Sequence, residues 1–372
     1  MKFSAKKSLF EQALLPVCKI VGTRTTLPLI ENVLLEAKGQ QLKIVATDLE
    51  IGMERFVDVD VLEEGSTTVP ARVFADVISN LKNVNIEIIQ DEKTKLLEVK
   101  GEGFNYKFNT CPSDEFPLLP EVIPMQSFYI NSTILREAIK DTVFAASPQG
   151  DVNTVLCGVF FQVNEGKLIM VATDGRRLAR KIITLDEKSS ISASFIAPVK
   201  ALNELVKNLN DLDENLQITI GGAQVLFKSN TFSFFSRLIE GQFPPYENII
   251  PEENPNKLNI DREKFLSSLK RAVILAQERE TPKLVKIKAY DGKMIITANT
   301  QDLGQAYEEV EYKGEEKREL AIAFNARFLI DVLGTIPNKD ITFEVSDPVK
   351  PAVVRPSEQN GYLYVVMPIK TS

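Results

Sequence analysis

The hydrophobic pattern of the chain repeats with a period much longer than that of a helix or a strand. Three apolar runs end in similar residues, and their alanines, Ala46, Ala172 and Ala298, stand 126 residues apart at each step. A period of this size is too long for a solenoid repeat and fits a small domain. The sequence therefore predicts one folding unit in three tandem copies. The expected domains span 1–125, 126–252 and 253–372.

Each copy opens with the apolar spacing of an amphipathic helix. In the first copy Leu9, Ala13 and Val17 fall at i, i+4 and i+8, and we expect an interruption near Pro16. The corresponding residues of the later copies are Leu135, Ile139, Val143, Phe265, Leu269 and Val273.

A second helix is predicted in each copy, beginning at Pro70, Pro198 or Asn325, because proline favours the first helical turn. Alternating strands, such as 34–37 and 42–46, lie between the helices. Each copy is therefore expected to be an α+β unit with two helices and an antiparallel sheet. The six expected helices span 2–15, 72–82, 130–143, 199–209, 261–273 and 326–336.

Charge is unevenly distributed along the chain. The net charge of −7 argues against a simple tight nucleic-acid binder. The six helix windows hold 14 basic and 8 acidic residues, so they carry +6 and leave −13 for the rest. This pattern indicates either a surface meant for phosphates or good helix formers on solvated faces. The second cause is the more common one, but it explains the recurrence of Arg72, Lys200 and Arg327 less well.

Composition excludes several classes of site. Histidine is absent, which removes histidine triads and histidine metal sites. The cysteines Cys18, Cys111 and Cys157 have no metal-ligand spacing and stand in apolar runs, so we expect buried free thiols. No run is apolar enough to span a bilayer, and the N-terminus lacks the features of a signal peptide. We therefore expect a cytoplasmic protein.

Two aspartates, Asp48 and Asp174, follow threonines at the ends of apolar runs. One interpretation is a metal-dependent nucleic-acid hydrolase, which would need several carboxylates in one place. Aspartate also favours turns, and the third copy has Thr300 at this position, so we expect structural turns. The chain has no nucleophile elbow, dinucleotide fingerprint or phosphate loop. We expect no catalytic residue, no metal and no cofactor.

Two segments, residues 175–178 and 365–369, have no counterpart in the other copies. The second is apolar although it stands near the end of the chain, where polar residues are usual. As a strand it would present Val366 to one side and Val365 to the other. Either both sides are core, or one side lines a surface groove.

These features together resemble a known family. The triplicated unit, Thr-Asp-Gly-Arg-Arg-Leu at 173–178, Gly-Gln-Phe-Pro-Pro-Tyr at 241–246 and the ending at 364–370 are similar to the bacterial DNA polymerase III beta subunit, the replicative sliding clamp. Residues 1–3 and 26–30 are similar too. The resemblance covers the whole chain in order.

The resemblance implies a processivity factor that is not an enzyme. Two chains would associate head to tail into a closed six-domain ring, whose helices surround duplex DNA without sequence specificity. By position, the residues expected to contact DNA are Arg24, Arg72, Lys200 and Arg327. Those expected at the homodimer interface are Tyr106, Ile274 and Leu275.

The resemblance also implies a groove between the second and third domains that binds short hydrophobic peptides. Its partners would be the polymerase III catalytic subunit, the clamp loader, other DNA polymerases and repair proteins. The chain departs from the family at Asn248, where many members have a basic residue, and at Asn153, which replaces a common arginine. By position, the groove residues are Leu156, Thr173, Gly175, Arg176, Arg177, Leu178, Pro244, Asn248, Ile249, Val349, Val365, Val366, Met367, Pro368, Ile369 and Lys370.

Two alternatives stand beside the clamp. The hydrolase would require the carboxylates of Asp48 and Asp174 to meet in one cluster. A repeat scaffold without any DNA function would predict no basic bias on the helices.

Overall fold

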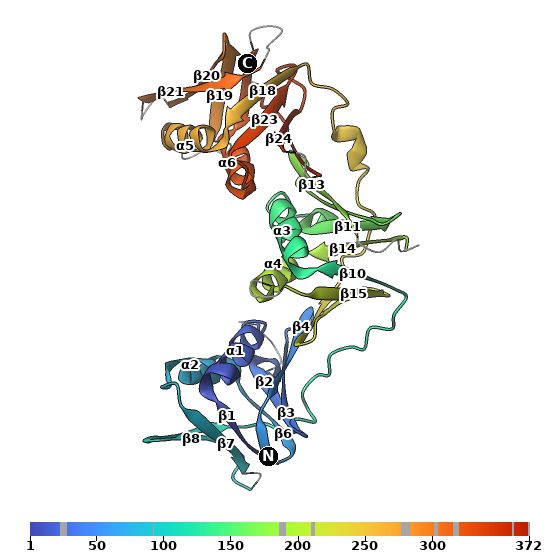
Figure 1. Ribbon diagram of the computed structural model, residues 1–372, viewed down its shortest axis with the longest axis vertical. Coiled ribbons are helices and arrows are strands. Elements are labelled where there is room, and N and C mark those ends of the chain that lie inside the picture. The colour runs from blue at the N-terminus through green and yellow to red at the C-terminus, as the bar shows by residue number, and fades with distance from the viewer. Residues whose placement is uncertain are drawn as a thin grey trace. The chain divides into compact units, whose positions relative to one another are not determined.

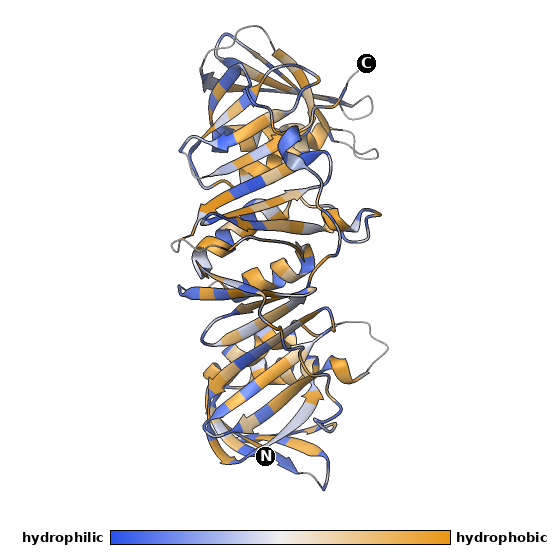
Figure 2. Ribbon diagram, turned by 90° about the vertical axis from the view of Figure 1, so that its right-hand side faces the viewer, coloured by the Kyte–Doolittle hydropathy of each residue, from blue (hydrophilic) through white to orange (hydrophobic). Residues whose placement is uncertain are grey.

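The structure is a computed structural model that describes residues 1–22, 28–91, 93–185, 191–209, 213–276, 283–300, 304–314, 320–358 and 361–370. The chain contains two compact units, which are Met1–Thr133 with Lys200–Leu238, and Ile134–Val199 with Ile239–Ser372 (Figure 1). Both units are α+β, as expected from the sequence, and their paired strands are antiparallel. Figure 2 shows apolar and polar residues interleaved along the strands.

The first unit contains two sheets. One has five strands, in the order β5 (Asp60–Glu63), β1 (Lys2–Lys6), β7 (Asn85–Asp91), β8 (Leu96–Gly101) and β9 (Phe104–Asn109). The other has eight, in the order β10 (Gln126–Asn131), β15 (Asn215–Gly221), β16 (Gln224–Lys228), β17 (Phe232–Arg237), β4 (Ile51–Asp58), β3 (Gln41–Thr47), β2 (Asn32–Lys38) and β6 (Gly65–Pro70).

The second unit contains one sheet of twelve strands. Their order is β14 (Ala193–Pro198), β11 (Gly158–Asn164), β12 (Lys167–Thr173), β13 (Arg177–Thr184), β25 (Tyr362–Val366), β24 (Ala352–Pro356), β23 (Asp340–Val345), β18 (Asn256–Asp261), β21 (Gly304–Lys313), β20 (Lys293–Thr300), β19 (Leu284–Tyr290) and β22 (Leu320–Asn325).

Six α-helices are found in the part of the chain that the structure describes. Three of them directly follow Pro70, Pro198 and Asn325, and each buries the apolar residue four positions beyond that start, as predicted. None of the described helices is both long and apolar enough to cross a membrane. The helices are α1 (Lys7–Cys18), α2 (Ala71–Asn80), α3 (Ser132–Val143), α4 (Val199–Asn208), α5 (Arg262–Ala272) and α6 (Ala326–Thr335).

The first helix begins later than the sequence predicts and is not interrupted. Residues 2–6 belong to β1, and α1 continues through Pro16 to Cys18. Because Pro16 has no N–H, the carbonyl of Gln12 loses its helical partner. It accepts a hydrogen bond from Arg55 Nη1 at 3.4 Å instead. A side chain from β4 therefore stabilises the turn that contains the proline.

The buried face of α1 agrees with the predicted one at Ala13 and Val17 but not at Leu9. Leu9 is 49% exposed, whereas Phe10 and Leu14 are fully buried. The helices α1 and α3 begin 125 residues apart, at Lys7 and Ser132, whereas the strands that hold the alanines, β3 and β12, begin 126 residues apart. The second copy therefore has one more residue between its first helix and this strand. Phe10 and Leu14 therefore correspond to Leu135 and Ile139, which are fully buried too.

The expectation of three buried thiols is correct only for Cys18. That side chain is 7% exposed, and burial raises the pKa of its thiol to about 12. Cys111 is exposed and Cys157 is partly exposed. Cys111 lies beyond the end of β9, where its backbone N–H and carbonyl pair with Thr68 while its side chain points outward.

One strand junction occurs twice in the chain with the same register. In the first unit β4 pairs with β17, and Arg237 N donates to Glu50 O at 2.9 Å. In the second unit β13 pairs with β25, and Met367 N donates to Arg176 O at 2.9 Å. The edge of one repeat is thus joined to the edge of another by backbone hydrogen bonds.

The corrected register of α1 makes a stability prediction. Phe10 packs between Phe3 and Phe74, with ring centroids 6.2 and 6.0 Å away. We expect Phe10→Ala to cost about 3–5 kcal/mol, because it leaves a cavity in a packed core. Leu9→Ala, the matched control on the exposed side, should change the denaturation midpoint only slightly. Equal losses for the two variants in urea unfolding would contradict the assigned register.

Candidate functional site

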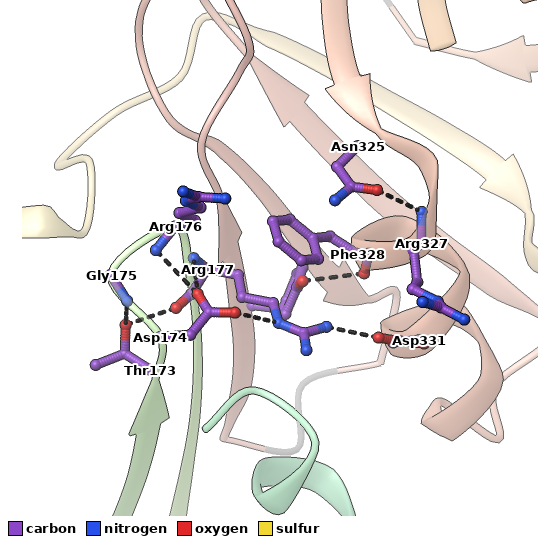
Figure 3. A network of polar contacts seen from close by, with 10 residues as sticks. Thr173, Asp174, Gly175, Arg176, Arg177, Asn325, Arg327, Phe328 and Asp331 are labelled. Atoms are coloured by element: carbon purple, nitrogen blue, oxygen red, sulfur yellow. Dashed lines mark hydrogen bonds and ion pairs between the residues drawn. The ribbon is translucent and has the colours of Figure 1, made fainter. Parts of the chain in front are cut away.

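The turn between β12 and β13 is built by the Thr-Asp pair that the sequence analysis singled out (Figure 3). Thr173 Oγ1 donates to Arg177 O at 2.6 Å and accepts from Gly175 N at 3.1 Å. Asp174 Oδ1 accepts from the backbone N–H groups of Arg176 and Arg177 at 2.9 and 3.0 Å. Gly175 has a φ of +80°, in the left-handed region that favours glycine.

The first copy builds the same turn from Thr47 and Asp48. Thr47 Oγ1 donates to Ile51 O at 2.8 Å, and Asp48 Oδ1 accepts from Ile51 N at 2.8 Å. Leu49 takes the place of Gly175 and is held at a φ of 74°. Both aspartates are therefore turn-forming residues, as expected. The described residues contain no group of three or more metal-ligating side chains.

Arg177 connects this turn with α6. Its Nε donates to Asp174 Oδ2 at 3.0 Å and its Nη1 to Asp331 Oδ2 at 2.6 Å (Figure 3). Its guanidinium also lies 4.5 Å from the ring centre of Phe328. Burial lowers the pKa of Arg177, but Tyr364, Asp331 and Asp174 together outweigh burial and raise the pKa above its usual value. Arg177 therefore stays charged, and its two ion pairs connect the β12–β13 turn to α6.

Sequence reasoning missed the residues that hold Arg177. Asp331 and Phe328 lie on α6, about 150 residues further along the chain. Tyr364 donates its hydroxyl to Phe328 O at 2.9 Å. Phe144 contributes a second ring, 5.7 Å from the Arg177 guanidinium. Phe328 and Asp331 lie on a predicted helix and Tyr364 lies in the ending at 364–370, but neither position indicated that these residues contact Arg177.

The C-terminal strand is buried on both faces, which answers the question that the sequence left open. All five residues of β25 are buried, including Val365 at 1% exposure and Val366 at 0%. Leu178, which pairs with Val365, is 1% exposed. These three residues are core in the unbound chain. After them, Met367, Pro368 and Ile369 are partly exposed and Lys370 is exposed.

An apolar cluster brings several of the expected groove residues together. Leu178 and Val365 pack with Phe243 and Tyr246, and Leu156 lies against them partly buried. Pro244 is partly exposed, and Asn248, Ile249 and Val349 are exposed. Ile250, and not Ile249, packs against the cluster. The buried members of the cluster also include Val171, Ile196, Val353 and Leu363.

The basic residues expected to contact DNA are exposed where the structure describes them. Arg72 and Arg327 are exposed on the first turns of α2 and α6. Lys200 is exposed too, but its Nζ forms an ion pair with Asp48 Oδ2 at 2.5 Å. Arg24 lies outside the described residues.

The residues expected at the subunit interface lie in two places. Tyr106 is on β9 and is 43% exposed. Ile274 is 68% exposed, in the single 3₁₀ turn (Val273–Leu275) that follows α5. Leu275 is partly exposed, and its carbonyl accepts a hydrogen bond from Thr300 Oγ1 at 2.6 Å.

Comparison with known protein families matches nearly the whole chain. Residues 1–120 match the N-terminal domain of the DNA polymerase III beta subunit. Residues 129–245 match its central domain, and residues 247–370 match its C-terminal domain.

Individual relatives match over their full length. The beta sliding clamp of Halalkalibacterium halodurans is 33% identical, and that of Staphylococcus aureus is 31% identical, each with all of both chains covered. The crystal structure of the DNA polymerase III subunit beta from Pseudomonas aeruginosa is 33% identical, with a TM-score of 0.94 over all of both chains. The sliding clamp from Bacillus subtilis is 28% identical, with a TM-score of 0.95 and the same coverage.

These matches agree with a chain built from repeated α+β units whose edges are joined strand to strand. The chain therefore belongs to the DNA polymerase III beta subunit family, the bacterial sliding clamps, which are processivity factors of DNA replication and not enzymes.

Proposed function

We propose that this clamp is a head-to-tail homodimer that closes into a six-domain ring around duplex DNA in the cytoplasm. The observation that carries the proposal is the strand junction that occurs twice within the chain, β4 with β17 and β13 with β25. These two junctions connect the first repeat to the second and the second to the third. One further edge of the same kind remains in the first repeat, and its complement remains in the third. Strand edges that are not paired with each other among the described residues of one chain can pair between two chains. The three domains would span 1–125, 126–252 and 253–372.

The two remaining edges are β9 and β21. β9 is the outermost strand of its sheet, and it follows β8 as β17 follows β16. β21 follows β20 as β13 follows β12, and among the described residues only its last residues pair with β18. Transferring the register of the two internal junctions places Lys107 opposite Gln305 of the partner subunit. Tyr106 then lies opposite the partner's Ala306.

The proposed ring can be tested by cross-linking. In a chain with Cys111→Ser, we expect Lys107→Cys with Gln305→Cys to form a disulfide between subunits, because directly opposite residues have Cβ atoms about 4.5–5.5 Å apart. The matched control is Lys107→Cys with Tyr307→Cys, two positions out of register. Gel electrophoresis without reductant measures the yield. Equal yields for the two pairs would contradict the register, and a monomer in light scattering would contradict the ring.

DNA binding is proposed to use exposed basic residues on the helices. Arg72, Lys200 and Arg327 occupy corresponding positions on α2, α4 and α6, and all three are exposed. Arg24 is proposed from the family pattern alone. Contacts of this kind neutralise phosphates without reading bases, which suits a protein that slides. Lys200 would have to exchange Asp48 for a phosphate.

The DNA contacts make a salt-dependence prediction. We expect Arg72→Ala and Lys200→Ala each to lower the slope of log affinity against log salt by about one unit, because each removes a phosphate contact. Fluorescence anisotropy with a short duplex over a salt series measures the slope. Lys293→Ala, which removes an exposed strand lysine, should leave it unchanged. An unchanged slope for both helix variants would argue against the assignment.

We further propose that polymerase III and other partners bind the groove at residues 156, 173, 175–178, 244, 248, 249, 349 and 365–370. The partners would be its catalytic subunit, the clamp loader, other DNA polymerases and repair proteins. Support comes from Leu156, which is partly exposed and packs against the apolar cluster, and from Met367, which is partly exposed and directly follows β25. The space above the turn is open, since a Cβ on Gly175 would meet no atom within 4 Å.

The groove makes a binding prediction. We expect Leu156→Ala and Met367→Ala each to weaken a labelled peptide from the C-terminus of the polymerase about tenfold, because each removes a partly exposed apolar contact. Leu62→Ala, an exposed leucine on β5, is the control. Single substitutions test the groove more specifically than removal of the C-terminal residues. That removal would also delete the backbone hydrogen bonds that Met367 N and Ile369 N donate. Unchanged affinity in both variants would contradict the groove.

A further inference from the structure

We propose that a pocket beside the apolar cluster binds a carboxylate of a partner peptide, with Arg180 as the residue that recognises it. The pocket has a volume of about 640 Å³ and lies over β13, β24 and β25, next to residues 252–255. Arg180 and Arg355 both line it. The inference rests on the proposed function, because it extends the groove that holds the peptide.

Arg180 carries a charge for which the described residues offer no direct partner. Among the described residues it has no hydrogen-bond or ion-pair partner, and its Nε is buried without one. Burial lowers the pKa of Arg180 and the nearby charge of Arg355 also lowers it, whereas Tyr246 and Glu247 act in the opposite direction without outweighing burial. A half-buried cation beside a second cation is unfavourable until an anion arrives. Carboxylates fit a guanidinium well because they accept two parallel hydrogen bonds.

Arg355, unlike Arg180, already has an ion-pair partner in Glu344. Its Nε donates to Glu344 Oε1 at 3.1 Å, which holds the guanidinium in place. Glu344 therefore compensates one of the two arginines only. An anion in the pocket completes the charge balance at Arg180.

A hydrogen-bond acceptor in the pocket lining, Asn254 Oδ1, also lacks a partner among the described residues. Asn254 lines the pocket and is 3% exposed, and its Oδ1 has no hydrogen-bond partner among the described residues. Its Nδ2 donates to Glu344 O at 3.4 Å, so the amide orientation is set and Oδ1 is the free end. A peptide with a side-chain carboxylate supplies the partner that the Arg180 guanidinium lacks.

The position of the pocket indicates a peptide and not a nucleic acid. Leu363 lines the pocket and also belongs to the apolar cluster, so the two sites are continuous. The pocket lining includes Glu252, Glu253 and Glu358, which are exposed. Exposed carboxylates of this kind repel a polyanion, whereas a single carboxylate on an anchored peptide can pass them.

The experiment compares peptides that differ by one charge. The labelled polymerase peptide is extended at either end by Gly-Gly and then by Glu or Gln. We expect one Glu peptide to bind the unmodified clamp about tenfold more tightly than its Gln counterpart, the change that 1.4 kcal/mol produces. Arg180→Gln should abolish this preference and leave the Gln peptide unaffected. Lys288→Gln, the matched control on β19, should keep the preference.

Three results would overturn the proposal. Equal affinities of the Glu and Gln peptides for the unmodified clamp would remove the carboxylate site and leave the groove intact. Failure of every peptide to bind would remove the groove as well. Loss of single-stranded DNA binding in Arg180→Gln, with no loss of peptide preference, would show a phosphate site.

Discussion

Antiparallel pairing of strand edges from successive repeats is the interaction on which the rest of this structure depends. β13 and β25 are about 180 residues apart, and their five paired positions bring the turn at 173–178 beside the end of the chain. Without this pairing the apolar cluster would lose Leu178 and Val365 together. The ion pair between Arg177 and Asp331 on α6 would also be lost, because the β12–β13 turn would no longer lie beside α6. Edge strands attract partners, and here the attraction is used to join repeats.

The sequence predicted most of the fold but not its exact registers. Equal spacing of three alanines correctly predicted the repeat, because the strand that holds the alanine recurs in each copy as β3, β12 and β20. The same period wrongly assigned Leu9 to the buried face of α1, since an insertion of one residue between two elements leaves no hydrophobic signal of its own. Leu9 and Phe10 are both apolar, and only packing shows which one is core.

The site was harder to predict than the fold. Family resemblance placed Leu178, Val365 and Val366 in the groove, yet the unbound chain buries all three. Burial of a strand residue depends on the neighbouring strands and helices that pack over it. The alternation of residues within one strand does not show which neighbours these are. The pairing of Arg177 with Asp331 spans 154 residues. Arg180 attracted no attention in the sequence because its missing partner is visible only once the neighbouring strands are in place.

The unpaired edge of β9 has a consequence for synthesis on the ribosome. The strand ends at Asn109 of 372 residues, so its sheet is complete while most of the chain is still unmade. β21, the strand that we propose as its complement in the partner subunit, is translated much later, at Gly304–Lys313. During this interval, neighbouring nascent chains on one messenger RNA present identical free edges to each other. Alternating Lys107 with an exposed Tyr106 gives the edge one charged face, which discourages nascent chains from pairing edge to edge before their own third repeat exists.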